Sequence, residues 1–450
     1  MAEVSFICKR TVVSTKPVQP GKFSPLSSLD RVMERNHLRL VFYYDFPTKR
    51  RSGEVTKKLR DSISEMLSAF PIVTGRLLRT PDGRWMIKCN DAGLRMVEAR
   101  VKGSVFAWLQ NVDREKELKL VHWEQMFHKP YFWPTFYVQI TEFEGGGLAI
   151  GLSCTHLLSD PICATMMIKA WADMTLSGKI KSPPLFHPLP LQTHENKNTN
   201  TTKLQSYLIN HYKSAIENPS PISHTKQTTI TLQFNQEMVR TCIAMAGIPN
   251  QHDHEPSLTP FQALAALFWT RISKVKGMKT ALVDMSICLD MRKVLDLDKG
   301  FFGNCMVYNR VLGDGLNENK VSKAAAFIEK AVSEMDGDEV MDLIEWLERE
   351  KCKNTPWMNG SHLICVNLEN VDSYSAVFEG NVSPIRVSYY IEPAVGPGQI
   401  VILPSPGGDG PYSRVVAVTL PEDEAEKLLE DALIQKFAPT ILVGLKKKLS

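Results

Sequence analysis

Runs of apolar residues predict a mixture of strands and helices along the chain. The small and apolar run at 147–154 is typical of a strand that is buried on both faces. Between 55 and 70, apolar residues instead recur at the spacing of one helix face, which predicts an amphipathic helix. The same criteria predict further strands at 3–13, 38–44, 84–89, 136–141, 227–234, 281–289, 306–312, 363–368, 384–391, 399–404 and 412–418, and helices at 164–176, 236–246, 259–275, 323–335 and 422–436. Because the two kinds of element mix without strict alternation, the pattern predicts a mixed α/β fold rather than a barrel.

The length and one change in composition predict two domains. At 450 residues the chain exceeds the size at which a single hydrophobic core keeps growing. Prolines and a polar run interrupt the pattern of elements between 178 and 228, as in a crossover segment. We therefore expect an N-terminal domain at 1–180, a crossover linker at 181–226 and a C-terminal domain of similar size at 227–450.

Composition and charge are those of an ordinary globular protein. Apolar residues make up 43% and charged residues 23% of the chain, and the net charge is +4. So small a charge, without a basic stripe interleaved with aromatic residues, argues against a nucleic-acid partner.

The cysteines and the apolar runs suggest a cytoplasmic location. Nine scattered cysteines without a CxxC pair suit a reducing compartment. We see no signal peptide, and the apolar runs are too short to span a membrane. The lysines at 446–448 resemble a dilysine retrieval signal, but a solvated helix end explains them better.

His156 is the first candidate for chemistry, because it follows the buried apolar run by two residues. A strand that carries an imidazole to its own end can mount a general base in the interior, where a channel can reach it. Asp160 lies four residues further on, so its carboxylate could orient the ring from the same helical turn. A helix-capping Asp160 beside a core histidine explains the spacing at least as well, and the pattern alone leaves both alternatives open.

Arg292 is a second candidate, just beyond the strand predicted to end at 289. A buried guanidinium needs a carboxylate partner, and Asp160 could supply one across the domain interface. The alternative is a solvated Arg292 on a turn. Gly300 and Gly303 flank two phenylalanines and indicate a tight turn that closes onto the next strand.

A third feature is the helix predicted at 259–275. Thr259 is a good N-cap, with Gln262 at the capping-box position. The basic end of this helix, with Arg271 and Lys274, could meet phosphates. A solvated basic face is the commoner explanation for such side chains.

Several familiar site patterns are absent from the sequence. It contains no Gly-rich phosphate loop before a helix, no GxSxG elbow, and no HExxH or CxxC metal pattern. The two histidines at 252 and 254 lie in a polar loop and fit a surface better than a metal site. We therefore expect no bound metal and no bound cofactor.

Eight short motifs together resemble the BAHD superfamily of plant acyl-CoA-dependent acyltransferases, and their order and spacing are more specific than any one of them. They lie at 25–30, 70–77, 89–93, 156–160, 258–269, 290–292, 302–304 and 403–406. The resemblance implies two α/β domains joined by a long crossover, with an active-site channel between them. It also implies a monomer that uses acyl-CoA as a co-substrate and acylates a hydroxyl or amine of a small acceptor. Arg271 and Lys274 then become candidates for binding CoA.

The resemblance also implies roles for three residues. His156 would be the general base, and no covalent acyl-enzyme would form. Asp160 would be structural, turned toward Arg292 of the other domain.

Two departures from the family pattern stand out. Pro161 follows the HxxxD motif where glycine is usual. The late Asp-Phe-Gly-Trp-Gly motif is missing, and the corresponding stretch at 387–396 has no tryptophan. That motif is thought to shape the fold and the channel, so its loss leaves the base in place but puts ordinary activity in doubt.

A similar loss marks the Glossy/Eceriferum-like branch, whose members support very-long-chain fatty acid elongation at the endoplasmic reticulum. The stretches 89–99 and 146–153 are similar to that branch. The alternative function is therefore a non-catalytic accessory protein of an elongase at the endoplasmic reticulum. Against it, the chain keeps the motifs at 290–292 and 302–304.

Overall fold

The computed structural model contains two compact units that each combine distant parts of the chain. It describes residues 3–16, 22–46, 53–80, 85–124, 133–190, 206–218, 225–247, 258–316, 320–350, 356–358 and 360–445. Unit 1 consists of Met1–His187, Asp298–Asn304 and Val371–Pro393, and unit 2 of Pro188–Leu297, Cys305–Asn370 and Ala394–Ser450. The predicted N-terminal domain was one continuous segment, 1–180. It did not include the two later segments of unit 1.

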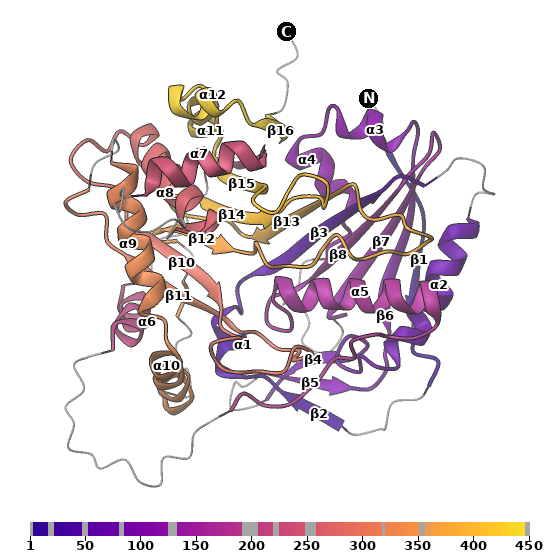
Figure 1. The fold of residues 1–450 in the computed structure, drawn as a ribbon. Coiled ribbons are helices and arrows are strands. Elements are labelled where there is room, and N and C mark those ends of the chain that lie inside the picture. The colour runs from indigo at the N-terminus through magenta and orange to yellow at the C-terminus, as the bar shows by residue number, and fades with distance from the viewer. Residues whose placement is uncertain are drawn as a thin grey trace. The chain divides into compact units, whose positions relative to one another are not determined.

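Unit 1 is built on a six-stranded sheet (Figure 1). Its strands, in spatial order, are β1 (Val4–Val12), β6 (Leu94–Val101), β7 (Phe136–Phe143), β8 (Leu148–Thr155), β3 (His37–Tyr44) and β13 (Arg386–Glu392). Only β6 and β7 are parallel; the other neighbours are antiparallel. The antiparallel neighbours β7 and β8 follow each other along the chain, whereas the pairing of β13 with β3 joins residues about 350 positions apart, as Glu392 and His37 show.

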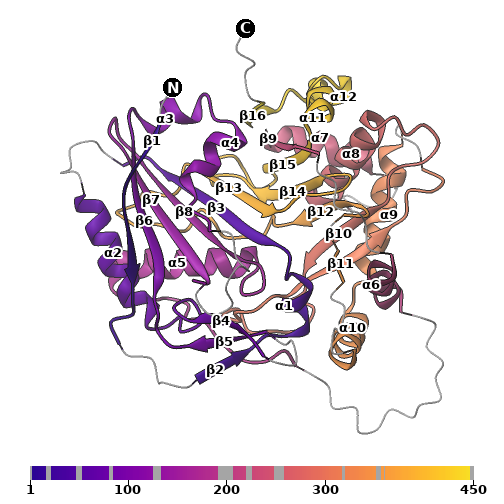
Figure 2. The same ribbon diagram turned by 180° about the vertical axis from the view of Figure 1, so that it is seen from behind.

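Helices α2 (Glu54–Leu67) and α5 (Pro161–Ser177) pack against each other, and α5 runs across one face of the sheet (Figures 1 and 2). All eight residues of β8 are buried, as its continuous apolar run predicted. Asp160 caps the start of α5, and Gly178 ends it in the left-handed conformation that glycine adopts without strain. The neighbouring strands and α5 therefore hold the C-terminal end of β8 in place.

A smaller sheet in unit 1 has the strand order β2 (Lys22–Pro25), β5 (Trp85–Cys89) and β4 (Arg76–Arg79). Strands β4 and β5 form an antiparallel pair, and residues 81–84 between them lie outside the described residues. Three short helices, α1 (Ser28–Val32), α3 (Val105–Leu109) and α4 (Arg114–Glu117), and the 3-10 turn Leu118–Leu120 complete the elements described in this unit.

Unit 2 is built on a seven-stranded mixed sheet. Its spatial order is β11 (Met306–Val311), β10 (Met285–Asp290), β12 (Leu363–Asn367), β14 (Gln399–Pro404), β15 (Arg414–Pro421), β9 (Gln227–Phe234) and β16 (Thr440–Val443). The helices described in this unit are α6 (Tyr207–Glu217), α7 (Gln236–Ala246), α8 (Pro260–Val275), α9 (Val321–Ser333), α10 (Gly337–Arg349), α11 (Glu422–Leu429) and α12 (Ala432–Phe437). The mixed α/β prediction is therefore confirmed in both units.

Two helix predictions in unit 2 have different outcomes. The capping box of Thr259 and Gln262 forms as predicted at the start of α8, which is buried along most of its length. The single helix predicted at 422–436 is wrong, because Asp431 caps a second helix and so divides the segment into α11 and α12. Among the described helices, none is long and apolar enough to cross a membrane.

Candidate active site

His156 lies directly after β8 with only 2% of its surface exposed. Its backbone N–H donates to the carbonyl of Asn36, at 2.9 Å, beside the start of the neighbouring strand β3. The imidazole is therefore buried at the end of the strand, as the apolar run predicted. The chemistry of this ring depends on which nitrogen carries the proton.

Asn304 determines which ring nitrogen of His156 carries the proton, because only one orientation of the Asn304 amide forms hydrogen bonds with all of its neighbours. The Nδ2 group donates two hydrogen bonds, to Asp30 Oδ1 and to the carbonyl of His156, each at 2.7 Å. Both partners are acceptors, so the amide nitrogen must face them. Asn304 Oδ1 then lies 2.9 Å from Nδ1 of His156 and can only accept. The ring is therefore protonated at Nδ1, and the lone pair is on Nε2.

Asp30 is the anchor of this network. Its Oδ1 accepts from the Asn304 backbone N–H at 3.1 Å as well as from the side chain. Its Oδ2 accepts from the Ser27 N–H and hydroxyl, at 2.7 and 2.9 Å, within the capping box that starts α1. Burial raises the pKa of the Asp30 carboxyl, and the hydrogen bonds from Asn304 and Ser27 oppose that rise.

The surroundings of His156 keep the imidazole neutral. Burial lowers its pKa below 6.5, which outweighs the opposing effects of the Asp160 carboxylate and the Asn304 hydrogen bond. A neutral ring with a free Nε2 lone pair is the form that a general base requires. The arrangement can therefore remove a proton from a hydroxyl or amine at neutral pH.

Asn304 reaches His156 because the segment Asp298–Asn304 is built into unit 1. The rings of Phe70, Phe186 and Phe302 form an aromatic cluster with centroid separations of 5.4 to 6.3 Å. Leu185 forms a short bridge with the same segment, donating to the carbonyl of Gly300 at 2.8 Å. A Cβ at Gly300 would lie 2.7 Å from the Pro183 carbonyl, so this close approach requires glycine.

Asp160 is fully buried and is the N-cap of α5. Its Oδ1 accepts from the backbone N–H groups of Ile162 and Cys163, at 3.1 and 2.9 Å. The capping role considered for Asp160 is therefore confirmed. Pro161, at the first helical position, removes no hydrogen bond there, because that N–H has no partner within a helix.

Arg292 belongs to unit 2 and is 7% exposed. Its Nη1 donates to Asp290 Oδ1 at 2.7 Å, two residues back along the chain. A partnership of Arg292 with Asp160 would join the two units and stays a prediction.

Arg271 and Lys274, the candidates for CoA binding, share one carboxylate within unit 2. The Nζ of Lys274 lies 3.0 Å and the Nη1 of Arg271 3.9 Å from Asp431 Oδ2. Arg271 is buried, whereas the Lys274 side chain is about half exposed. Their role in CoA binding stays a prediction.

No cluster of three or more potential metal ligands occurs among the described residues. The eight cysteines that the structure describes are free thiols. His252, His254 and the lysines at 446–448 lie outside the described residues.

The first part of the stretch that lacks the family's tryptophan motif, residues 387–392, belongs to β13, which is buried along its whole length. Arg386, Ser388 and Tyr390 of this strand each donate to the carboxylate of Glu117, which is fully buried in α4. Tyr43 of β3 donates to the same carboxylate at 2.8 Å. This network could not be predicted from the sequence, because one glutamate in a polar segment carries no signal of burial.

The comparisons with known proteins agree with this fold. The model of the Transferase family matches residues 2–433. Protein ECERIFERUM 26-like from Arabidopsis thaliana is 27% identical, over 93% of this chain and 92% of its own length. Rosmarinate synthase from Plectranthus scutellarioides is 25% identical, over 93% of this chain and 96% of its own length.

Two solved structures share the fold at lower identity. Vinorine synthase aligns with a TM-score of 0.73 at 17% identity, over 98% of this chain and all of its own. F. sporotrichioides TRI101 in complex with coenzyme A and T-2 aligns with a TM-score of 0.68 at 15% identity, over 94% of this chain and all of its own. Together with the family match, these results show that the chain belongs to the Transferase family, the BAHD superfamily of acyltransferases, and is similar to its Glossy/Eceriferum-like branch.

Proposed function

We propose that this protein transfers an acyl group from acyl-CoA to a hydroxyl or amine of a small acceptor, with Nε2 of His156 as general base. The observation that carries the proposal is the hydrogen bond between His156 Nδ1 and Asn304 Oδ1 at 2.9 Å. It leaves Nε2 as the basic nitrogen of a neutral ring. Membership in an acyltransferase family and the fold shared with a coenzyme A complex support the choice of co-substrate.

The proposed reaction proceeds in two steps without a covalent acyl-enzyme. In the first, Nε2 of His156 takes the proton of the acceptor while the acceptor oxygen or nitrogen attacks the thioester carbonyl. The tetrahedral intermediate then collapses, the carbon–sulfur bond breaks, and CoA leaves as the thiolate. The imidazolium returns its proton to that sulfur, so His156 ends the cycle neutral. Asn304 holds Nδ1–H throughout, and its carbonyl oxygen stabilises the charged ring.

Asp160 and Arg292 are proposed to support the site from the two units. Replacing Arg292 by alanine should cost about 3 kcal/mol of stability, because the buried Asp160 would lose its cationic partner. Asp290→Ala is the control, since that carboxylate is about one-third exposed and its ion pair with Arg292 should contribute no more than about 1 kcal/mol. An unchanged melting temperature in Arg292→Ala would contradict the proposed pairing of Asp160 with Arg292.

We further propose that the protein acts in the cytoplasm as a monomer, without a nucleic-acid partner and without a bound cofactor. The free thiols of the described cysteines support a reducing compartment. The net charge of +4 supports small-molecule rather than nucleic-acid partners.

The experiment is a transfer assay with panels of acyl-CoA donors and of hydroxyl and amine acceptors. Release of the CoA thiol and the mass of the acylated product are both measured. His156→Ala should reduce turnover about 10²- to 10⁴-fold, the usual contribution of a general base. His122→Ala is the matched control, because His122 is a partly buried histidine of unit 1 that pairs with Glu124 instead. Absence of transfer throughout the panel, or full activity in His156→Ala, would overturn the proposal.

A second candidate function is an accessory, non-catalytic role in very-long-chain fatty acid elongation at the endoplasmic reticulum. The similarity to the ECERIFERUM proteins favours it. It predicts that the protein co-purifies with a condensing enzyme and changes the chain lengths of the products. At equal protein levels, His156→Ala should then retain the effect on the chain lengths of the products. The transferase proposal instead predicts that this variant loses its function.

A further inference from the structure

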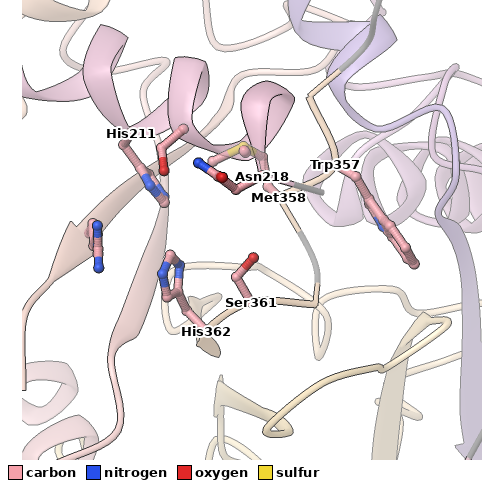
Figure 3. Close-up of a pocket in the computed structure, with 9 residues that line it drawn as sticks. His211, Asn218, Trp357, Met358, Ser361 and His362 are labelled. Carbon is pink, nitrogen blue, oxygen red and sulfur yellow. The ribbon is translucent and has the colours of Figure 1, made fainter. Parts of the chain in front are cut away.

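A pocket of about 270 Å³ in unit 2 has the features of a second ligand site. One wall is the face of α6 that carries His211, together with Asn218, the C-cap of this helix, which lies seven residues further along the chain. Arg310 of β11 and the residues Trp357, Met358, Ser361 and His362, which precede β12, form the other walls. Figure 3 shows the two histidines on one side and Trp357 on the other, with Asn218 and Met358 between them.

The two histidines are held by one hydroxyl group. Ser286 Oγ lies 3.2 Å from Nε2 of His211 and 3.1 Å from Nδ1 of His362. A hydroxyl has a single hydrogen, so it donates to one ring and accepts from the other. Ser286 is fully buried in β10, which makes it a support for the rings rather than a group that meets a ligand.

His211 has a second nitrogen that this arrangement does not use. Its Nδ1 is buried and has no hydrogen-bond partner in the part of the chain that the structure describes. The residue itself is only 5% exposed. A buried polar atom without a partner destabilises a fold and is rare in native proteins, so it points to a partner supplied from outside the chain.

The charges around the pocket select an anion. Burial, His362 and Arg310 lower the pKa of His211 to about 3. Burial and then Arg310 lower the pKa of His362, with Asp284 opposing them. Asp284 itself is engaged with Arg310 at 2.5 Å. An anionic group beside the two rings would add to the compensation that Asp284 gives Arg310, and it would accept a hydrogen bond from the one ring N–H that does not face Ser286.

The rest of the pocket determines where the anion lies. Helix α6 ends at the side of Asn218, where exposed carbonyls and the helix dipole disfavour negative charge. Trp357 and Met358 offer an indole face and a thioether, which suit an apolar or aromatic body. The anionic end of a ligand therefore belongs beside His362 and Arg310, and the apolar end beside Trp357.

We propose that this pocket binds a small amphiphilic carboxylate, with the carboxylate at His211, His362 and Arg310 and an aromatic body against Trp357 and Met358. The lining shares no residue with the network of His156, and the proposal does not depend on transferase activity. It assigns the chain a second small-molecule site.

The test uses the full chain and two pairs of probes, benzoate with benzamide and 3-phenylpropanoate with 3-phenylpropanamide. Binding is measured by calorimetry and by ligand-observed NMR. We expect the acid of at least one pair to bind about tenfold or more tightly than its neutral amide. Equal binding of acid and amide in both pairs, or no binding of either acid, would overturn the proposal.

Variants then locate the bound acid. Arg310→Gln and His362→Ala should each weaken binding about tenfold or more, whereas Trp357→Ala should weaken acid and amide together. Arg240→Ala is the control, because that arginine lies over the ring of Tyr412 and outside the pocket. His156→Ala should bind the acid as the unaltered chain does, so a failed transferase assay leaves this result standing. Unchanged affinity in both Arg310→Gln and His362→Ala would place the acid elsewhere and reject the site.

Discussion

Two of the buried carboxylates of unit 1, Asp30 and Glu117, differ in the side chains that they hold. Asp30 accepts from Ser27 on one side and from Asn304 on the other, and Asn304 continues the network to His156. Glu117 accepts from the side chains of Tyr43, Ser388, Arg386 and Tyr390. The first network ends at the imidazole of His156, whose Nε2 is the proposed base. In the second network, side-chain donors surround the Glu117 carboxylate.

The Glu117 network involves the stretch in which the family motif is missing, whereas the Asp30 network involves His156, the proposed base. Burial and the Glu117 carboxylate raise the pKa values of Tyr43 and Tyr390, so both hydroxyls stay protonated as donors. The Glu117 network fastens β13, the strand that replaces the tryptophan motif, to β3 and α4. The Asp30 network uses none of those residues. The two networks therefore share no residue, although Asn36, whose carbonyl accepts from the His156 N–H, also donates to the Glu392 carbonyl of β13 at 3.4 Å.

Replacing Glu117 by alanine should have the largest effect on stability. It removes the carboxylate from the nearly buried Arg386, and breaking a buried pair from one side costs about 3–5 kcal/mol. Chemical denaturation measures the loss, and Glu117→Gln should lose less because the amide keeps an acceptor. The transferase activity of the folded fraction should not change. A variant of normal stability would show that the network does not hold β13.

Asn304→Ala breaks the other network. We expect turnover to fall about 10²-fold or more, because His156 loses the acceptor that fixes its proton on Nδ1. The matched control is Asn309→Ala, a buried asparagine of unit 2 that donates to the Ala331 carbonyl. Both variants should lose about 1–3 kcal/mol of stability, but only Asn304→Ala should lose turnover. Equal activity in the two variants would exclude a positioning role for Asn304.

The pH dependence of kcat/KM sharpens the comparison, because only the network of Asp30 ends at a titrating base. Burial lowers the pKa of His156 below 6.5, so the ring is neutral at pH 7 and becomes protonated as the pH falls through that pKa. The rate constant should be level near neutrality and should fall about tenfold per pH unit on the acid side. A rate profile across pH 4.5 to 8, a window chosen to bracket that pKa, measures this limb. An acid limb centred above pH 6.5 would contradict the assignment.

Tyr43→Phe should have the smallest effect of the four. It removes one donor from Glu117, and the donors on β13 remain. The expected loss is about 1 kcal/mol, the net contribution of one hydrogen bond, measured by chemical denaturation. A loss as large as that of Glu117→Ala would mean that Tyr43, rather than β13, holds the carboxylate.

Local features of the fold could be predicted from the sequence. The apolar run at 147–154 gave β8, and with it the burial of His156. The start of α8 followed from Thr259 and Gln262, because capping depends on residues three apart. Where the local signal was weaker, the predicted helix boundaries were wrong. Asp431, for example, divides the last predicted helix in two.

The contacts that make the site could not be predicted in the same way. Asn304 is 148 residues from His156, and Asp30 is 274 residues from Asn304. No periodicity links such positions, because they are brought together by tertiary contacts such as the packing of Phe302 and the bridge at Leu185. The family resemblance singled out Asp30 and Asn304 within motifs but did not imply their contact. The pairing of β13 with β3 was missed for the same reason.

The most direct test of the central claim is the protonation state of His156, read by nitrogen NMR of the chain with ¹⁵N-labelled histidine at pH 7. Comparison with His156→Ala assigns the resonances. The account predicts a neutral ring that carries its proton on Nδ1 and a lone pair on Nε2, and it predicts that Asn304→Ala disturbs this state. A ring protonated on Nε2 alone, or an imidazolium at pH 7, would contradict it.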